Sequence, residues 1–161
     1  MVMGPDGEKL AERPEAAASL DSRLLAKVDA AFESAARRAQ TALEITDSSD
    51  DVADRFESAL LAVLEAAASE PDLTRLVLVE APGLGAPAVE RKETGLQRFV
   101  DLLDRELAAG NGGAPPPLVA EMVVGGIYEV VQGAARAGDF ASMPSLAGEL
   151  RQLWLPALRG R

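Results

Sequence analysis

The sequence contains no cysteine and no histidine. Without cysteine it can form neither disulfide bonds nor metal sites built on thiolates, although this absence does not fix the redox compartment. Without histidine, the catalytic triads and dyads that depend on an imidazole are excluded, as are zinc sites that use histidine and the Glu-x-x-His pairs of di-iron bundles. These absences favour a protein that is not an enzyme and that needs no metal or cofactor.

Aromatic residues and positive charge are also scarce. Aromatics make up 4% of the 161 residues, with a single Trp and a single Tyr, and the formal net charge is −10. Binding to nucleic-acid phosphates needs clustered Lys and Arg, whereas the adjacent basic residues Arg37-Arg38 and Arg91-Lys92 are isolated pairs. The sequence therefore predicts no direct nucleic-acid binding by this chain.

Two further absences concern membranes and secretion. No run of about eighteen apolar residues is free of charge, so a membrane-spanning helix is not expected. The opening segment, MVMGPDGEKLAERPE, lacks the basic start and the apolar core of a secretory signal. We therefore expect a cytoplasmic protein without membrane contacts.

What the sequence does contain is a succession of segments with apolar residues at three- and four-residue spacing, which is typical of amphipathic helices. Hydrophobic residues make up 48% of the chain, and no convincing strand appears. We predict an all-α fold, a single helical-bundle domain of about six helices at 19–161, after a loose leader at 1–18. The first helix is expected to start near Ser19 or Asp21, and the others are expected at 51–69, 71–81, 87–109, 117–137 and 144–158.

The most apolar of these segments ends before Gly138, and the other helices are expected to pack around it. A proline is tolerated in the first helical turn, so Pro117 can start this helix, and Gly138 is placed as a terminating glycine. A broad apolar stripe predicts burial on most sides. Gly125, Gly126 and Gly133 each cost about 1 kcal/mol relative to alanine, so another backbone is expected to pack closely against them. The stripe consists of Val119, Val123, Ile127, Val130 and Ala134.

Some polar and aromatic residues allow two interpretations. Carboxylates crowd the start of the helix at 51–69 and recur at Asp101 and Asp104. They could bind Mg²⁺, but they are more typical of solvated helix faces that complement the helix dipole. Tyr128 and Trp154 could each anchor a ligand or pack in a core or interface. For Trp154, which lies in a stripe of leucines, packing is the favoured interpretation.

From about residue 22 onward, the order of segments resembles the C-terminal domain of TetR-family transcriptional regulators. The stretch LLAKVDAAFESAARRAQ resembles the helix that follows the DNA-binding head in that family. The stretch FESALLAVLEAAASEPDLTRLVLVEAPGLGAPAVERKETGLQRFVDLL resembles its middle helices, and LVAEMVVGGIYEVVQGAARAGDFASMPSLAGELRQLWLPAL resembles its last two. The family's helix-turn-helix head has no counterpart in the sequence.

The resemblance implies an effector-binding and dimerisation domain that senses a small apolar or amphipathic molecule, without a DNA-binding head of its own. The alternative is a structural dimerisation module that modulates an intact regulator by forming heterodimers. In the family, the last two helices meet their symmetry mates in a four-helix bundle, which implies a homodimer here.

Both the cavity and the interface can be assigned candidate residues. The cavity is expected among the helices at 51–69, 71–81, 87–109 and 117–137. Its candidate lining residues are Phe56, Leu60, Leu64, Leu76, Phe99, Leu103, Met122 and Tyr128. The candidate dimer interface comprises Gly125, Gly126, Gly133, Leu146, Leu150, Leu153 and Trp154.

Overall fold

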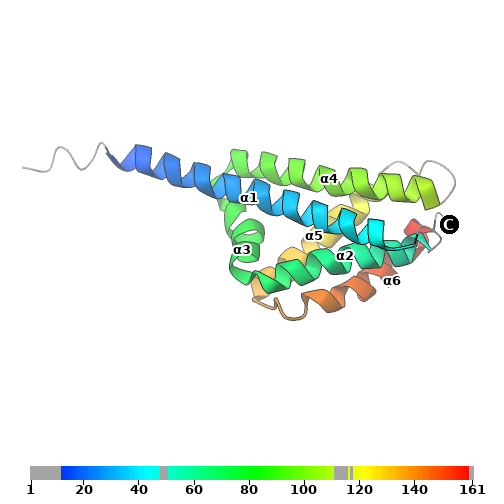
Figure 1. Ribbon diagram of the computed structural model, residues 1–161. Coiled ribbons are helices and arrows are strands. Elements are labelled where there is room, and N and C mark those ends of the chain that lie inside the picture. The colour runs from blue at the N-terminus through cyan, green and yellow to red at the C-terminus, as the bar shows by residue number, and fades with distance from the viewer. Residues whose placement is uncertain (1–11, 48–50, 111–115, 117, 160–161) are drawn as a thin grey trace, which may run out of the picture.

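The computed structural model describes residues 12–47, 51–110, 116 and 118–159. Within these ranges the chain is all-α, and its six α-helices pack into one bundle (Figure 1). The predicted fold class is therefore confirmed. The helices are α1 (Glu12–Ile45), α2 (Val52–Ser69), α3 (Pro71–Arg75), α4 (Ala86–Gly110), α5 (Val119–Ala137) and α6 (Leu146–Leu158). A π-helical turn (Leu76–Glu80) and two 3-10 turns (Ala81–Leu84 and Met143–Ser145) connect them.

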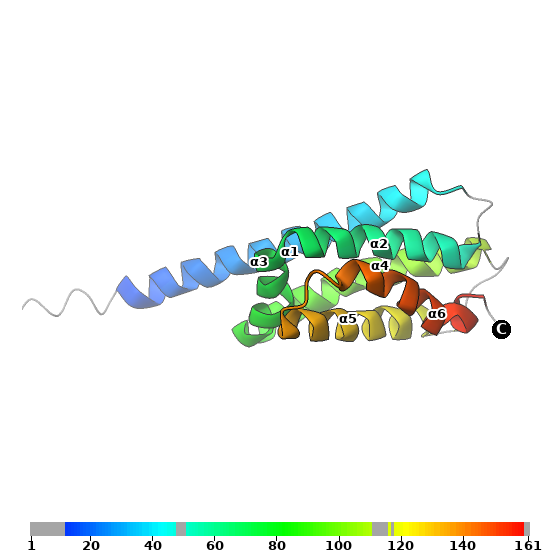
Figure 2. The same cartoon turned by 90° about the horizontal axis from the view of Figure 1, so that it is seen from below.

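The long helices α1, α2 and α4 run side by side along the molecule, and α5 and α6 pack against them (Figure 1 and Figure 2). The short helix α3 lies across one end of the bundle and leads into the π-helical turn. The N-terminal part of α1 extends beyond the other helices, as Figure 2 shows. The first buried side chain that the structure describes in α1 is accordingly Val28.

Two apolar clusters hold the bundle together. The larger one joins α2, α4, α5 and α6, and its centre includes the almost fully buried Leu64, Leu107 and Leu158. Full burial of such a side chain contributes about 1.5–3 kcal/mol. The smaller cluster, which joins α1 to α5 and to the connecting turns, consists of Val28, Phe32, Val77, Ala81 and Tyr128.

Helix α1 begins earlier than predicted, at Glu12 rather than near Ser19 or Asp21. The second part of the predicted leader, 12–18, is therefore helical. Three consecutive alanines in this part favour helix strongly. Pro14 falls within the first turn, where the missing N–H has no intrahelical partner to lose.

Helix α5 begins later than predicted, at Val119. Pro117, the predicted start, lies outside the described residues, and the N-cap is Leu118 with a left-handed φ of 69°. A helix cannot continue through a left-handed residue, so α5 starts after it. At the other end, Gly138 adopts a left-handed φ of 74° and its N–H bonds the carbonyl of Ala134. The predicted terminating glycine is confirmed.

The segment predicted as one helix at 71–81 is helical but not uniform. After α3, the turn Leu76–Glu80 is π-helical, and the N–H of Ala81 donates to the carbonyl of Leu76. In an α-helix the carbonyl of Leu78 would accept from the residue four positions on. That residue is Pro82, which has no N–H. The carbonyl of Leu78 is therefore left for a partner outside its own helix.

Within one protomer, helix α5 is buried on one face only, so the protomer does not cover it on most sides as predicted. Val123 and Ala135 are fully buried, whereas Met122 is 63% exposed and Val130, a member of the predicted stripe, is 41% exposed. The reason is the position of α5 at the edge of the bundle, where its neighbours lie on its inner side (Figure 2).

Arg55 of α2 fixes this helix against α4 and against the end of α1. Its guanidinium pairs with Glu106 at 2.7 Å and donates to the carbonyl of Thr46 at 3.1 Å. The side chains of Arg55 and Glu106 are only 15% and 22% exposed. A partly buried charge without its partner is costly. The contacts of Arg55 therefore hold the start of α2 against the last turns of α4 and against the end of α1.

Asp51 connects the start of α2 to the end of the described chain. Its carboxylate accepts from the N–H of Ala53 at 3.0 Å and pairs with Arg159 at 2.6 Å. The hydrogen bond from Ala53, and then that from Arg159, stabilise the charged form. They lower the pKa of Asp51 below its ordinary value of 3.8.

Replacement of Asp51 by asparagine is expected to reduce stability more at about pH 7 than at about pH 3. A carboxyl group whose pKa is lower in the folded state contributes stability above its unfolded pKa and loses it as the pH falls through the folded pKa. Urea midpoints of the wild type and Asp51→Asn at both pH values measure this difference. The matched control is Asp104→Asn, an exposed position on α4. A destabilisation by Asp51→Asn that is equal at both pH values would contradict the prediction.

Candidate functional site

An apolar cavity of about 240 Å³, partly open to solvent, lies between α1, α2, α4, α5 and the segment 70–78. Its lining is almost entirely hydrocarbon, from alanine, valine, leucine and phenylalanine side chains. An apolar cavity of about 150 Å³ stays dry and binds benzene. The cavity described here therefore has room for a molecule larger than benzene.

Most of the candidate ligand residues lie around this cavity. They come from α2, α4 and α5, and four of the five elements that enclose the cavity are those in which it was predicted. Whether these side chains bind a ligand stays a prediction, since pockets and cores use the same residue types. The candidates that line the cavity are Phe56, Leu60, Leu64, Phe99, Leu103 and Tyr128.

Two candidate residues, Leu76 and Met122, do not line the cavity. Leu76 is half-buried in the π-helical turn, whose extra residue shifts which side chains face inward. Met122 precedes Tyr128 by six positions, which places the two side chains on different faces of a helix with 3.6 residues per turn. Tyr128 faces the cavity, and Met122 is consequently exposed to solvent. Both assignments to the cavity are wrong.

Helix α1 supplies one wall of the cavity, which sequence reasoning did not predict. Its apolar stripe was visible in the sequence, but nothing there indicated which helices it would cover. The contact between α1 and α4 is close, because a Cβ at Gly95 would lie 2.3 Å from Cγ of Phe32. Glycine at this position lets the ring of Phe32 lie against the α4 backbone. The residues of α1 that line the cavity include Phe32, Ala35, Ala39 and Leu43.

A buried hydrogen-bonded pair consists of Tyr128, which lines the cavity, and Gln132, which does not. Gln132 of α5 is only 4% exposed, and its Nε2 lies 2.7 Å from the carbonyl oxygen of Leu78 and 3.2 Å from Oη of Tyr128. Burial, and then the nearby carboxylate of Glu129, raise the pKa of Tyr128 above its ordinary value of 10.0. The hydroxyl of Tyr128 is therefore protonated at neutral pH.

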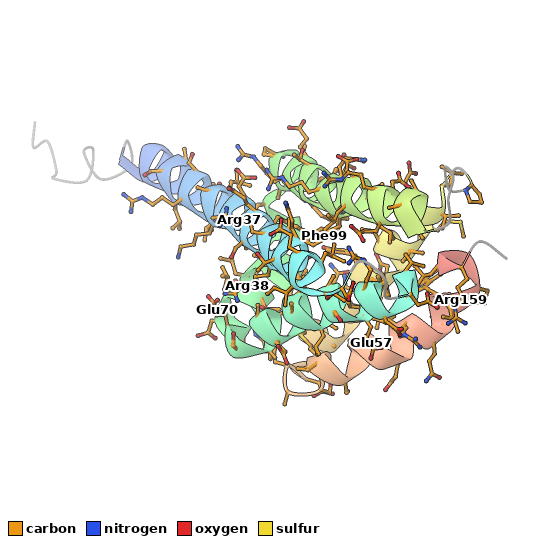
Figure 3. The ribbon with its side chains drawn as sticks, turned by 45° about the vertical axis from the view of Figure 1, so that its right-hand side comes forward. Arg37, Arg38, Glu57, Glu70, Phe99 and Arg159 are labelled. Atoms are coloured by element: carbon orange, nitrogen blue, oxygen red, sulfur yellow. The ribbon has the colours of Figure 1, made fainter. Side chains whose placement is uncertain are left out.

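Charged groups occur at the edge of the cavity. Arg38 of α1 and Glu70 at the end of α2 both belong to its lining and are exposed to solvent. Figure 3 shows them on the same side of the molecule, with Phe99 between α1 and α4. With one charge of each sign, this rim can accommodate a polar group at one end of a ligand without requiring a particular charge.

Helices α5 and α6 expose several apolar residues to solvent, on the side of α5 that also carries the exposed Glu129. We call this surface the α5–α6 face. In the described protomer, a Cβ at Gly125 or Gly133 would find no atom of another element within 4 Å. The backbone approach predicted for these two glycines is therefore not made within one copy of the chain. The α5–α6 face consists of Leu118, Met122, Gly125, Val130, Gly133 and Leu153.

Gly126 is covered within the protomer by a side chain. A Cβ at this position would lie 2.8 Å from Cζ2 of Trp154, so the indole ring packs directly on the α5 backbone. Trp154 is half-buried and belongs to the larger apolar cluster. The preference for packing over ligand anchoring at Trp154 agrees with this position.

Two candidate interface residues lie in the core instead. Leu150 is only 4% exposed, and Leu146 is half-buried against the larger apolar cluster. Helix α6 turns this side toward α2, where Arg151 forms ion pairs with Asp54 and Glu57. The assignment of Leu150 to the dimer interface is therefore wrong, whereas Leu153, at 66% exposure, remains available for one.

Two kinds of feature are absent from the described ranges, namely carboxylate groups suited to a metal ion and helices able to cross a membrane. No group of three or more carboxylates there lies close enough together to hold a metal ion. None of the helices seen in the structure combines the length and the apolar composition that crossing a membrane requires.

Comparisons of the chain with protein-family models, with curated proteins and with solved structures find no match. The case for a function therefore depends on the cavity, on the α5–α6 face and on the sequence resemblance.

Proposed function

We propose that the chain is the effector-binding and dimerisation domain of a TetR-like transcriptional regulator, and that its effector is a small apolar or amphipathic molecule. The observation that carries the proposal is the cavity of about 240 Å³. Well-packed domains contain few voids larger than a water molecule. An apolar cavity of this size with a few polar groups at its ends is the usual form of a small-molecule site.

The chemistry of the lining supports an apolar effector. Each methylene group that moves from water into the cavity contributes about 0.8 kcal/mol. Of the charged side chains in the lining, Glu106 is neutralised by its pairing with Arg55. Arg38 and Glu70 are exposed at the rim. An amphipathic molecule could place its polar end between them.

Homodimerisation through the α5–α6 face is the second part of the proposal. Exposed apolar side chains on two neighbouring helices are typical of an interaction surface. Gly125 and Gly133 have no side chain to keep a second helix at a distance, so two copies could approach closely there. Gly125 and Gly133 would then serve the assembly rather than the protomer.

An apolar aromatic probe is expected to stabilise the protein. At a free n-butylbenzene concentration of about 100 times its Kd, binding adds roughly 2.7 kcal/mol. For a domain of this size, that corresponds to a rise in Tm of roughly 5–10 °C. Differential scanning fluorimetry measures the shift, and calorimetric titration measures the affinity. If no apolar compound of this size raises Tm, the cavity is not a binding site.

The α5–α6 face by itself also favours a second candidate function, a structural dimerisation module that pairs with an intact regulator. Both functions need the exposed residues of α5 and α6, but only effector sensing needs an occupant in the cavity. A protein that self-associates tightly and takes up no apolar compound would support the structural module.

A further inference from the structure

The hydrogen bonds around the π-helical turn fix the orientation of one polar group in the cavity. Pro82 cannot donate to the carbonyl of Leu78, and the amide of Gln132 takes that place at 2.7 Å. Gln132 lies 54 residues further along the chain, on α5. Leu78 is half-buried, and a carbonyl oxygen shielded from water favours such a donor, because leaving it unpaired costs about 1–3 kcal/mol.

The bond to Leu78 determines which way the amide of Gln132 points. A carbonyl oxygen only accepts hydrogen bonds, so the amide atom that faces Leu78 must be the nitrogen. The same nitrogen lies 3.2 Å from Oη of Tyr128 and has one hydrogen left for it. Tyr128 Oη therefore accepts from Gln132, and its own proton must point elsewhere.

No carbonyl or carboxylate among the described residues accepts the hydroxyl proton of Tyr128. The side chain is 8% exposed and lines the cavity. It belongs to one apolar cluster with Val77 and Phe32, and Nζ of Lys92 lies 5.5 Å from the ring centre. Tyr128 thus carries a hydroxyl donor without an acceptor among the described residues, on a side chain that lines an apolar space.

We propose that Tyr128 donates a hydrogen bond to a single uncharged acceptor oxygen, such as a ketone or ester carbonyl, on an otherwise apolar ligand. This inference rests on the proposed function, because it concerns the occupant of the same cavity. Gln132 acts as a positioning residue: it directs the hydroxyl proton toward the ligand. A charged group at this depth is disfavoured, because its desolvation would not be compensated.

A pair of probes that differ only by a carbonyl group tests the proposal. Propiophenone has an acceptor oxygen, and n-propylbenzene has the same carbon skeleton without one. Tyr128→Phe is expected to lower the affinity for propiophenone by roughly 3- to 10-fold, as the loss of one hydrogen bond predicts. The affinity for n-propylbenzene should change by less than about twofold, since the apolar lining is kept. Calorimetric titration of both probes against both proteins measures these values.

Two further variants complete the test. Gln132→Met removes the group that orients the hydroxyl, and it should also weaken propiophenone selectively. Leu103→Met alters the apolar lining at nearly constant volume and should affect both probes to the same extent. Equal losses of both probes in Tyr128→Phe would overturn the inference while leaving cavity binding intact. Failure of both probes to bind the wild type would overturn the proposed function as well.

Discussion

If two copies pair through the α5–α6 face as proposed, glutamate in place of Leu153 is expected to leave the protein monomeric. Leu153 is 66% exposed on α6 and is absent from both apolar clusters, so the change should leave the folded protomer intact. In a twofold interface each substitution is present twice. Burial of two carboxylates without partners costs several kcal/mol, which corresponds to a rise in Kd of roughly 100-fold or more.

Light scattering coupled to size exclusion measures the outcome. The wild type should have twice the protomer mass of 16.8 kDa, and Leu153→Glu should have the protomer mass alone. The matched control is Leu20→Glu, which places the same charge at a 56% exposed leucine of α1, away from the α5–α6 face. A wild type that stays at the protomer mass at micromolar concentration ends the dimer proposal. Leu150 is unsuitable for this test, because it is buried within the protomer. A glutamate there would destabilise the folded protomer, so loss of the dimer would not identify the interface.

Tryptophan in place of Leu60 is expected to abolish uptake of n-butylbenzene. Leu60 is 8% exposed and lines the cavity, so a larger ring must enter the space that a ligand would occupy. The affinity should fall by roughly 100-fold or more, as expected when most of the apolar contact area is lost. Stability should change far less than in a filled core, where overpacking costs about 1–3 kcal/mol.

The control for this variant keeps the volume at the same position. Leu60→Met should retain uptake of the probe, because isosteric apolar changes are tolerated. Chemical denaturation of the wild type, Leu60→Trp and Leu60→Met shows whether a loss of probe binding comes from a filled cavity or from unfolding. If Leu60→Trp unfolds the protein, the space around Leu60 is a packed core rather than a cavity. If the folded variant still binds the probe with unchanged affinity, the binding site lies elsewhere.

The all-α fold could be predicted because its signals are local. The spacing of Phe56, Leu60 and Leu64 specifies an amphipathic helix without reference to any other segment. The end of α5 at Gly138 is equally local, since a left-handed glycine terminates a helix by its own conformation. Helix starts were less certain. The alanines before Ser19 moved the start of α1 from about Ser19 to Glu12, and the left-handed Leu118 moved the start of α5 from 117 to Val119.

The types of residue that line the cavity could be predicted from the sequence, but the set of helices that surround it could not. Leu64 and Leu107 have the same side chain and are both almost fully buried, yet only Leu64 lines the cavity. The wall supplied by α1 depends on the close contact between Phe32 and Gly95, residues from different helices. Periodicity shows which face of a helix is apolar, but it does not show where neighbouring helices leave a space.

The sequence by itself determined that this chain forms helices, where most of them lie, and that no imidazole or thiol chemistry is available to it. Only the tertiary structure decided which apolar side chains remain exposed, as the contrast between Val130 and the buried Val131 shows. It also decided that Gln132 pairs with both the carbonyl of Leu78 and Oη of Tyr128. This pairing depends on Pro82, which has no N–H for that carbonyl, and on Gln132 reaching it from another helix. The physical reason is the same in each case, because burial and hydrogen-bond pairing depend on segments that are distant in the sequence.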